Sequence, residues 1–139
     1  MKRPIIILIV ILTFFITTVA LYSTEFEFDD FLEVRRFEDE DPVKIIAVRR
    51  KSGSSSVRLE ITDSDDIGEI MDILRENTTY RGKRIGAFGN RQRITLIDAE
   101  GKETDVDEMW WGYMNYYADS SELSEKIYDV GVEQGKFFP

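Results

Sequence analysis

The chain has 139 residues, a formal net charge of −9 at pH 7, and neither histidine nor cysteine. The absence of imidazole and thiol groups excludes a Ser-His-Asp triad, a cysteine nucleophile, an imidazole or thiolate metal site, a lipid-modified cysteine and any disulfide. The acidic charge argues against nucleic acid as a partner, because binding phosphates requires a basic face.

An uncharged apolar run occupies residues 5–22, directly after Met1-Lys2-Arg3-Pro4. Its 18 residues fall within the roughly 17–25 that a membrane-spanning helix needs. Lys2 and Arg3 precede the run and acidic residues follow it, and positive charge stays on the cytoplasmic side of a membrane. We therefore predict a single-pass protein of the cell membrane, anchored through residues 5–22, with its N-terminus inside and its domain outside.

The same run is also compatible with a cleaved signal peptide. Such a peptide has a basic start, an apolar core and small residues at the cleavage site. Thr18-Val19-Ala20 offers a site of this kind, with cleavage after Ala20. On this alternative the protein is secreted, whereas the length of the run favours the anchor.

Residues 23–42 are predicted to be an acidic, aromatic stalk next to the membrane. They carry six apolar side chains, which are many for a plain linker: Phe26, Phe28, Phe31, Leu32, Val34 and Phe37. The segment is therefore an interfacial or partner-binding element, a continuation of the anchor helix, or an arm packed on the domain. Because Pro42 biases Asp41 away from helix, the domain is predicted to cover residues 43–139.

The domain is predicted to begin with a hairpin of strands over residues 43–50 and 56–62. The second of these strands alternates strictly, which is typical of a strand with one buried face. A helix follows, with Asp63 as its N-cap. Apolar residues at helical spacing predict the buried stripe of this helix: Ile67, Ile70, Met71 and Leu74.

Three further strands and a second helix are predicted in the rest of the domain. Strands over residues 91–98 and 103–106 are joined by a turn that contains Gly101. The aromatic residues 109–117 are predicted to form one strand, and Asp119 to cap the last helix. The order β-β-α-β-β-β-α predicts an α+β domain, in which an antiparallel sheet carries two helices packed on one face.

The stretch Ile61-Thr62-Asp63 is followed by Ile67 and Ile70, and this pattern carries a resemblance of the domain to other proteins. Over residues 43–117 it resembles small exported or membrane-anchored Gram-positive bacterial proteins of unknown function. Those proteins share a strand hairpin, a capped helix, a meander and an aromatic-rich strand. The resemblance implies a domain of sheet plus helix and no known activity, and no catalytic residue carries over.

The aromatic stretch is the first candidate binding surface. In a single strand over residues 109–117, Trp111, Tyr113 and Tyr117 share one face, and Trp110 lies on the other. Both faces cannot easily be core in a sheet covered on one side, so one face is expected to offer a platform for a sugar ring or a protein partner. Alternatively, the last helix or the stalk covers that face.

A basic set is the second candidate surface: Arg81, Lys83, Arg84, Arg91 and Arg93. Arginine and lysine side chains of this kind bind an anionic cell-wall polymer or a lipid headgroup. The alternative is that they pair with the many acidic residues nearby.

We therefore expect a non-catalytic, membrane-anchored binding or accessory module outside a bacterial cell, with a protein or an anionic cell-wall polymer as partner. No cofactor, no metal and no catalytic residue are expected. The alternatives are a small envelope enzyme that acts on glycans through paired carboxylates, and a sensor or inhibitor domain that contacts another membrane protein.

Overall fold

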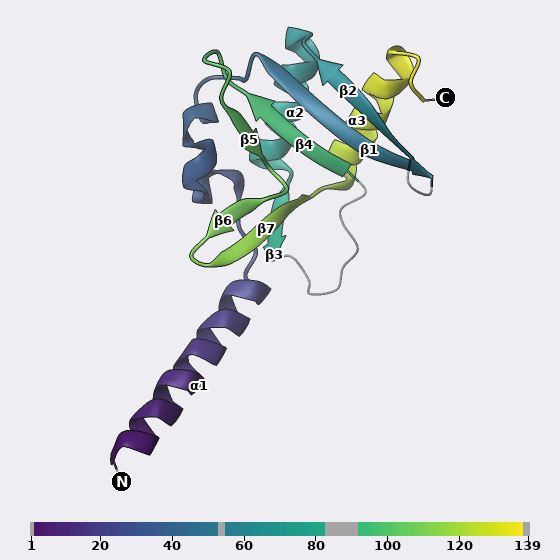
Figure 1. Ribbon diagram of the computed structural model, residues 1–139. Helices are drawn as coiled ribbons and strands as arrows, with labels where there is room; N and C mark the ends of the chain where they lie inside the picture. Colours follow the sequence, from purple (N-terminus) through teal and green to yellow (C-terminus); the bar gives the residue numbers. More distant parts are fainter. Residues whose placement is uncertain (1, 53–54, 83–91, 138–139) are drawn as a thin grey trace.

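The computed structural model describes residues 2–52, 55–82 and 92–137 (Figure 1). An apolar helix, α1 (Lys2–Ser23), projects from a domain of two antiparallel sheets and further helices. The α+β class with an N-terminal apolar helix is therefore confirmed. The single predicted sheet is wrong, because the strands divide into a four-stranded and a three-stranded sheet.

The four-stranded sheet has the strand order β2-β1-β4-β5. Its strands are β1 (Lys44–Ser52), β2 (Ser55–Ile61), β4 (Gln92–Ile97) and β5 (Glu103–Asp105). In the central strand, Ile45 pairs with Ile61 on one side and with Leu96 on the other, and all three side chains are buried. The predicted alternation of the hairpin is thus confirmed, and it directs one face of the sheet toward the core.

Helices α2 (Ser64–Glu76) and α3 (Ser121–Glu133) lie on one face of this sheet (Figure 1). The predicted stripe of α2 is buried, and the Asp63 carboxylate accepts the backbone N–H groups of Asp65 and Asp66, as an N-cap does. Asp119 does not cap α3. Ser120 caps it instead, by accepting the N–H of Leu123, because Asp119 is the last residue of a strand.

The three-stranded sheet has the order β3-β7-β6 and contains the aromatic stretch. Its strands are β3 (Thr79–Gly82), β6 (Met109–Trp111) and β7 (Met114–Asp119). The predicted single strand over residues 109–117 is wrong, because the chain reverses at Gly112 and Tyr113. Gly112 has a φ of +64°, and Trp111 pairs with Met114. Glycine with positive φ at the first position of a two-residue loop is typical of a type II′ hairpin turn.

Residues 23–42 pack on the domain, which is one of the alternatives left open by the sequence. They contain two 3₁₀ helices, η1 (Phe28–Asp30) and η2 (Leu32–Phe37). Four of their side chains are buried in the common hydrophobic core: Phe28, Phe31, Val34 and Phe37. Phe26 also forms a two-way backbone bridge with Tyr80 of β3. This segment, called the arm below, is therefore part of the folded domain.

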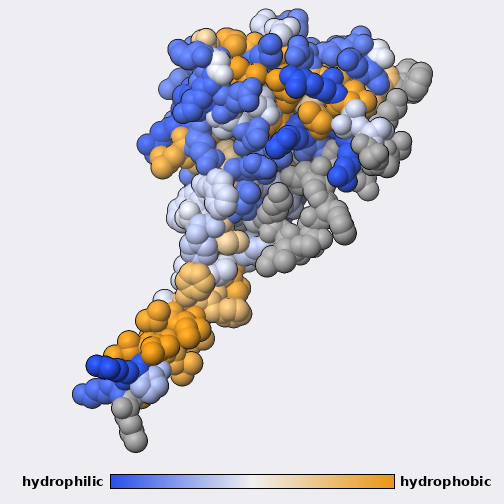
Figure 2. All heavy atoms as spheres, in the orientation of Figure 1, coloured by the Kyte–Doolittle hydropathy of each residue, from blue (hydrophilic) through white to orange (hydrophobic). Residues whose placement is uncertain are grey.

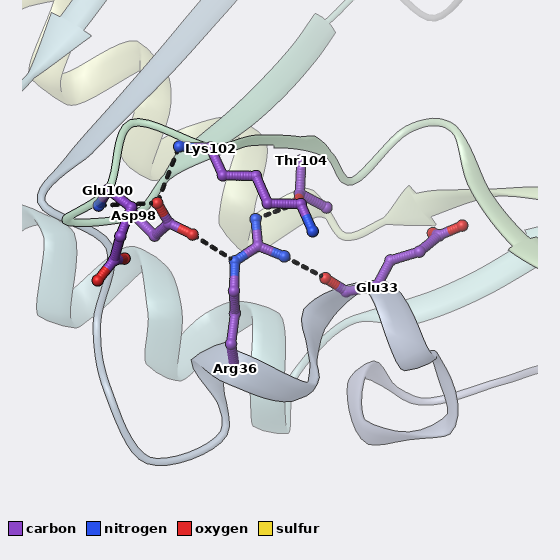
Figure 3. Close-up of polar contacts among 6 residues, drawn as sticks. All are labelled: Glu33, Arg36, Asp98, Glu100, Lys102 and Thr104. Atoms are coloured by element: carbon purple, nitrogen blue, oxygen red, sulfur yellow. Dashed lines mark hydrogen bonds and ion pairs between the residues drawn. The ribbon is translucent and has the colours of Figure 1, made fainter.

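Arg36 fastens the arm to the turn between β4 and β5 (Figure 3). Its guanidinium lies 2.8 Å from the Asp98 carboxylate, and donates to the Glu33 carbonyl at 2.8 Å and to the Thr104 hydroxyl at 2.5 Å. Asp98 also accepts the backbone N–H of Lys102 at 2.8 Å. Because one guanidinium joins three segments, the arm and the four-stranded sheet form one unit.

Candidate functional site

Helix α1 exposes most of its apolar surface to the surroundings. None of its described residues is buried, and the exposed fraction of its side chains reaches 64% at Leu8 and Phe15. In length and composition the helix can span a membrane or serve as a signal sequence. Figure 2 shows the apolar helix, the hydrophilic domain, and a zone of intermediate hydropathy where the two meet.

Three hydroxyl side chains of α1 have partners within the helix. The hydroxyls of Thr17 and Thr18 donate to the carbonyls of Thr13 and Phe14, each at 2.8 Å. The hydroxyl of Ser23 bonds to the carbonyl of Val19 in the same way, at 2.8 Å. Since these hydroxyls bond to carbonyls of the preceding turn, they do not prevent the helix from lying in lipid.

The β6–β7 hairpin lies where the domain meets α1 (Figure 1). Three of its large aromatic side chains are exposed. The exposed fractions are 54% for Trp110, 41% for Trp111 and 43% for Tyr113. Large aromatic side chains that stay exposed next to each other are typical of binding surfaces. We call these three residues the aromatic tip.

The aromatic tip contacts the last turns of α1 directly. The Tyr113 hydroxyl lies 2.6 Å from the Thr18 hydroxyl, and the Tyr113 ring stacks on Phe14 with centroids 5.4 Å apart and planes 13° apart. On the neighbouring strand, the Tyr116 hydroxyl donates to the carbonyl of Leu21. The hairpin therefore lies along the helix instead of only being connected to it through the chain.

A continuous set of aromatic rings connects the aromatic tip to the core. Trp111 stacks on Phe26 at 5.2 Å, and Phe26 meets Tyr116 edge-on at 4.8 Å. Phe31 then contacts Phe26 at 5.8 Å and Tyr80 at 5.3 Å. Because Tyr80, Tyr116 and Phe31 are buried, the exposed tip rests on a rigid aromatic base.

Strand β3 also approaches α1 closely, through Gly82. A Cβ atom at Gly82 would lie 2.8 Å from the carbonyl oxygen of Tyr22, which is shorter than normal contact. Only glycine allows the strand and the end of the helix this separation. The junction of α1 with the domain is therefore closely packed on two strands.

The structure brings together only part of the site predicted from the sequence. Trp111 and Tyr113 share the aromatic tip, whereas Tyr117 lies on β7 opposite Arg81 and is only partly exposed. Trp110, which the strand interpretation placed on the other face, still alternates with Trp111 along β6, and it belongs to the aromatic tip because it is exposed in the same hairpin. The sequence signal for this hairpin is Gly112, since a glycine inside an aromatic run is typical of a turn.

The basic set does not form a free cationic patch in the part that the structure describes. Arg81 lies 2.7 Å from Glu25 and 3.0 Å from Asp119. Arg93, on the other sheet, lies within 4.0 Å of three carboxylates, those of Asp105, Asp107 and Glu108. Each arginine is thus surrounded by acidic groups, which was the alternative left open by the sequence. Lys83, Arg84 and Arg91 lie outside the described residues.

A second site is a cavity of about 180 Å³ between β4, β7 and α3. Two carboxylates line it, those of Asp107 and Asp119, together with Gln92 and Tyr117. Burial, with a smaller contribution from the nearby charges of Asp105 and Glu108, raises the pKa of Asp107 and outweighs its own backbone N–H and the Arg93 charge, which lower it. Asp119 is bound by Arg81, and no cluster of three metal-ligating side chains occurs among the described residues. The cavity therefore offers one carboxyl with a perturbed pKa.

Comparisons with protein-family models, with curated proteins and with solved structures find no match to this chain. A functional proposal therefore depends on the geometry of the molecule alone.

Proposed function

We propose that this chain is a membrane-anchored binding or accessory module that works outside a bacterial cell without catalysing a reaction. In this proposal α1 stays attached and crosses the membrane, Lys2 and Arg3 lie inside, and the domain lies outside. The observation that carries the proposal is the contact of Tyr113 with Thr18 and Phe14, which holds the aromatic tip against the outer end of the anchor.

The same contact argues for an anchor over a cleaved signal peptide. Cleavage after Ala20 would remove Phe14 and Thr18, and Tyr113 would lose both its stacking partner and its hydroxyl partner. Tyr22, which lies against Gly82, would be the second residue of the new chain. A signal sequence that is discarded needs no surface shaped to fit the mature domain, so this fit supports a retained helix.

The exposed aromatic tip supports a binding role. Tryptophan and tyrosine supply large contact areas at low entropic cost and are enriched at binding interfaces. The buried aromatic rings hold the aromatic tip in place before it binds. A binding surface that is preorganised in this way loses less entropy on binding. The resemblance to small exported or membrane-anchored Gram-positive bacterial proteins belongs to the same proposal.

A small envelope enzyme that acts on glycans is the second candidate function, and Asp107 is the observation that favours it. Its raised pKa in a cavity is the property expected of a general acid. Such an enzyme would release sugar from cell-wall material, and Asp107→Asn would abolish the release. The leading proposal expects no release from either protein.

The first test of the proposal is the intact mass and the location of the protein in a bacterial host. Full-length protein in the membrane fraction, with its domain degraded by protease added outside the cell, would support the anchored module. A species that begins near Leu21 in the medium or wall fraction would contradict it. Tyr113→Phe is the matched variant, because it removes the hydroxyl contact and leaves the candidate site Thr18-Val19-Ala20 unchanged.

A further inference from the structure

We propose that the aromatic tip is inserted into the outer face of the membrane that α1 spans, with lipid as its binding partner. Trp110, Trp111 and Tyr113 would lie at the boundary between headgroups and acyl chains. This inference rests on the proposed function, because it requires that α1 is retained and spans the bilayer. It names the partner of the aromatic tip as the lipid interface and not a soluble ligand.

The position of Tyr113 along α1 gives the depth of the tip. Its two helix partners, Thr18 and Phe14, lie four and eight residues before Tyr22, where the apolar run ends. At 1.5 Å per residue, Tyr113 lies about 6–12 Å below the end of the run. Interfacial elements are buried by about 5–10 Å at the boundary between headgroups and acyl chains. A spanning α1 therefore places Tyr113 at this depth, and Trp111, which stacks on Phe26 just beyond the apolar run, lies nearer the headgroups.

The chemistry of the hairpin suits this depth. Between Glu108 and Asp119 the chain carries no charged residue. Trp and Tyr are the residues enriched at membrane interfaces, because an apolar ring and a polar group share one side chain. The Tyr113 hydroxyl is already paired with Thr18, so inserting it does not leave it without a partner.

The backbone of the hairpin also has few groups to leave unpaired in lipid. Trp111 pairs with Met114 across a loop of two residues, and Met109 pairs with Tyr116. A two-residue loop is the shortest common hairpin connection. Unpaired backbone groups are costly in the bilayer. On the outer edge of β6, the Trp110 N–H donates to the Glu33 carboxylate at 3.2 Å, so this edge group also has a partner.

The exposed surface of α1 favours lipid over a protein as the partner of the aromatic tip. At the depth of Tyr113 the helix itself is open, with exposed fractions of 63% for Phe14 and 50% for Val19. The aromatic tip and this helix surface are in contact and form one apolar surface. Because lipid must cover the helix, it also covers the tip at the same depth. The helix and hairpin together then prevent free rotation of the domain about the helix axis.

Tryptophan fluorescence tests this directly, because the only two tryptophans of the chain are Trp110 and Trp111. Full-length protein is reconstituted in phosphatidylcholine/phosphatidylglycerol vesicles whose acyl chains are brominated near the headgroup or near the methyl end. We expect blue-shifted emission, strong quenching by the bromines near the headgroup, and protection from aqueous iodide. Trp110→Phe and Trp111→Phe assign the signal to each ring.

A reporter at the far side of the domain provides the control. Val43 is 54% exposed and directly precedes β1, and β1 starts at the end of the domain away from α1 (Figure 1). In a protein with Trp110→Phe and Trp111→Phe, the substitution Val43→Trp is expected to give emission that iodide quenches and brominated lipid does not. This control shows that quenching by lipid reports the hairpin and not mere attachment to vesicles.

Three outcomes overturn the inference. Quenching by iodide without quenching by brominated lipid would place the tip in water. Protection from both quenchers would mean that a second copy of the chain covers the tip. In either case, full-length protein that floats with the vesicles leaves the anchored module intact. Protein that does not float with the vesicles would overturn the proposed function together with the inference.

Discussion

The hydroxyl oxygen of Tyr113 lies 2.6 Å from that of Thr18, although the two residues are 95 positions apart in the chain. One belongs to a hairpin of the folded domain and the other to an apolar helix that is otherwise exposed. A helix joined to a domain only by its covalent link would rotate and tilt freely. This contact, together with the Phe14 stack, fixes the direction in which α1 leaves the domain.

Removing the Tyr113 ring is expected to loosen the hairpin from the helix. Tyr113→Ala loses both the stack on Phe14 and the hydroxyl contact, so we expect faster amide hydrogen exchange in β6 and β7. Tyr113→Phe keeps the stack and loses one hydrogen bond, worth about 0.5–1.5 kcal/mol, and should change exchange less. Equal exchange in all three proteins would show that the contact does not hold the hairpin.

Two glycines are expected to respond in opposite ways to alanine. At Gly82 the added Cβ would lie 2.8 Å from the backbone oxygen of Tyr22, which cannot rotate away. Gly82→Ala should therefore lower the free energy of unfolding by about 1–3 kcal/mol. Gly68 lies in α2, where the nearest atom would be 4.0 Å away, so Gly68→Ala should raise it by about 0.5–1 kcal/mol. Thermal unfolding of the full-length protein in detergent measures both.

Two buried tyrosines provide a second matched pair. Tyr80 is fully buried, its hydroxyl has no hydrogen-bond partner among the described residues, and burial raises its pKa. Tyr80→Phe should therefore be neutral or should stabilise the protein by up to about 1 kcal/mol. Tyr116 donates to the Leu21 carbonyl, so Tyr116→Phe should cost about 0.5–1.5 kcal/mol. A larger loss for Tyr80→Phe in thermal unfolding would mean that its hydroxyl has a partner.

Elements with strong local signals could be predicted from the sequence. The Asp63 cap and the apolar stripe of α2 lie within one helix, and Ile45 and Ile61 alternate within one hairpin. Both patterns have the period of the structure they predict, 3.6 or 2 residues, and the structure confirms them.

The arm has a different period, that of a 3₁₀ helix. Its buried residues Phe28, Phe31, Val34 and Phe37 recur every third position, which is the repeat of a 3₁₀ helix. Phe28 and Phe31 also fit an α-helical face together with Leu32, so the local pattern leaves the structure of this segment open. Packing on the domain was one of the alternatives for it.

The site could be predicted only in part, because its partners are far apart in sequence. The aromatic residues were found from composition, but the turn at Gly112 changes which of them lie together. No local pattern predicts that Tyr113 meets Thr18, since that contact depends on how the three-stranded sheet packs on α1.

As the pH falls, protonation of Asp107 and protonation of Asp98 are expected to change the stability of the protein in opposite directions. Burial raises the pKa of Asp107 above its ordinary value of 3.8, so the folded protein binds this proton more tightly than the unfolded chain. The ionised carboxylate therefore costs stability above the raised pKa, and the cost disappears as the pH falls below 3.8. Asp107→Asn should raise the unfolding temperature at pH 7. The corresponding gain in the free energy of unfolding is about 1 kcal/mol or less, and it should be smaller near pH 3.

Asp98 is the matched control for this titration. Partial burial opposes its ionisation, but the Lys102 N–H, the Arg36 charge and the Glu100 N–H outweigh burial and lower its pKa. Its contribution is therefore present above the ordinary value of 3.8 and is lost as the pH falls through the lowered pKa. Asp98→Asn should lower the unfolding temperature at pH 7, and the difference from the unsubstituted protein should shrink in acid. If both substitutions shifted stability in the same direction at pH 7, the burial of Asp107 would not govern its ionisation.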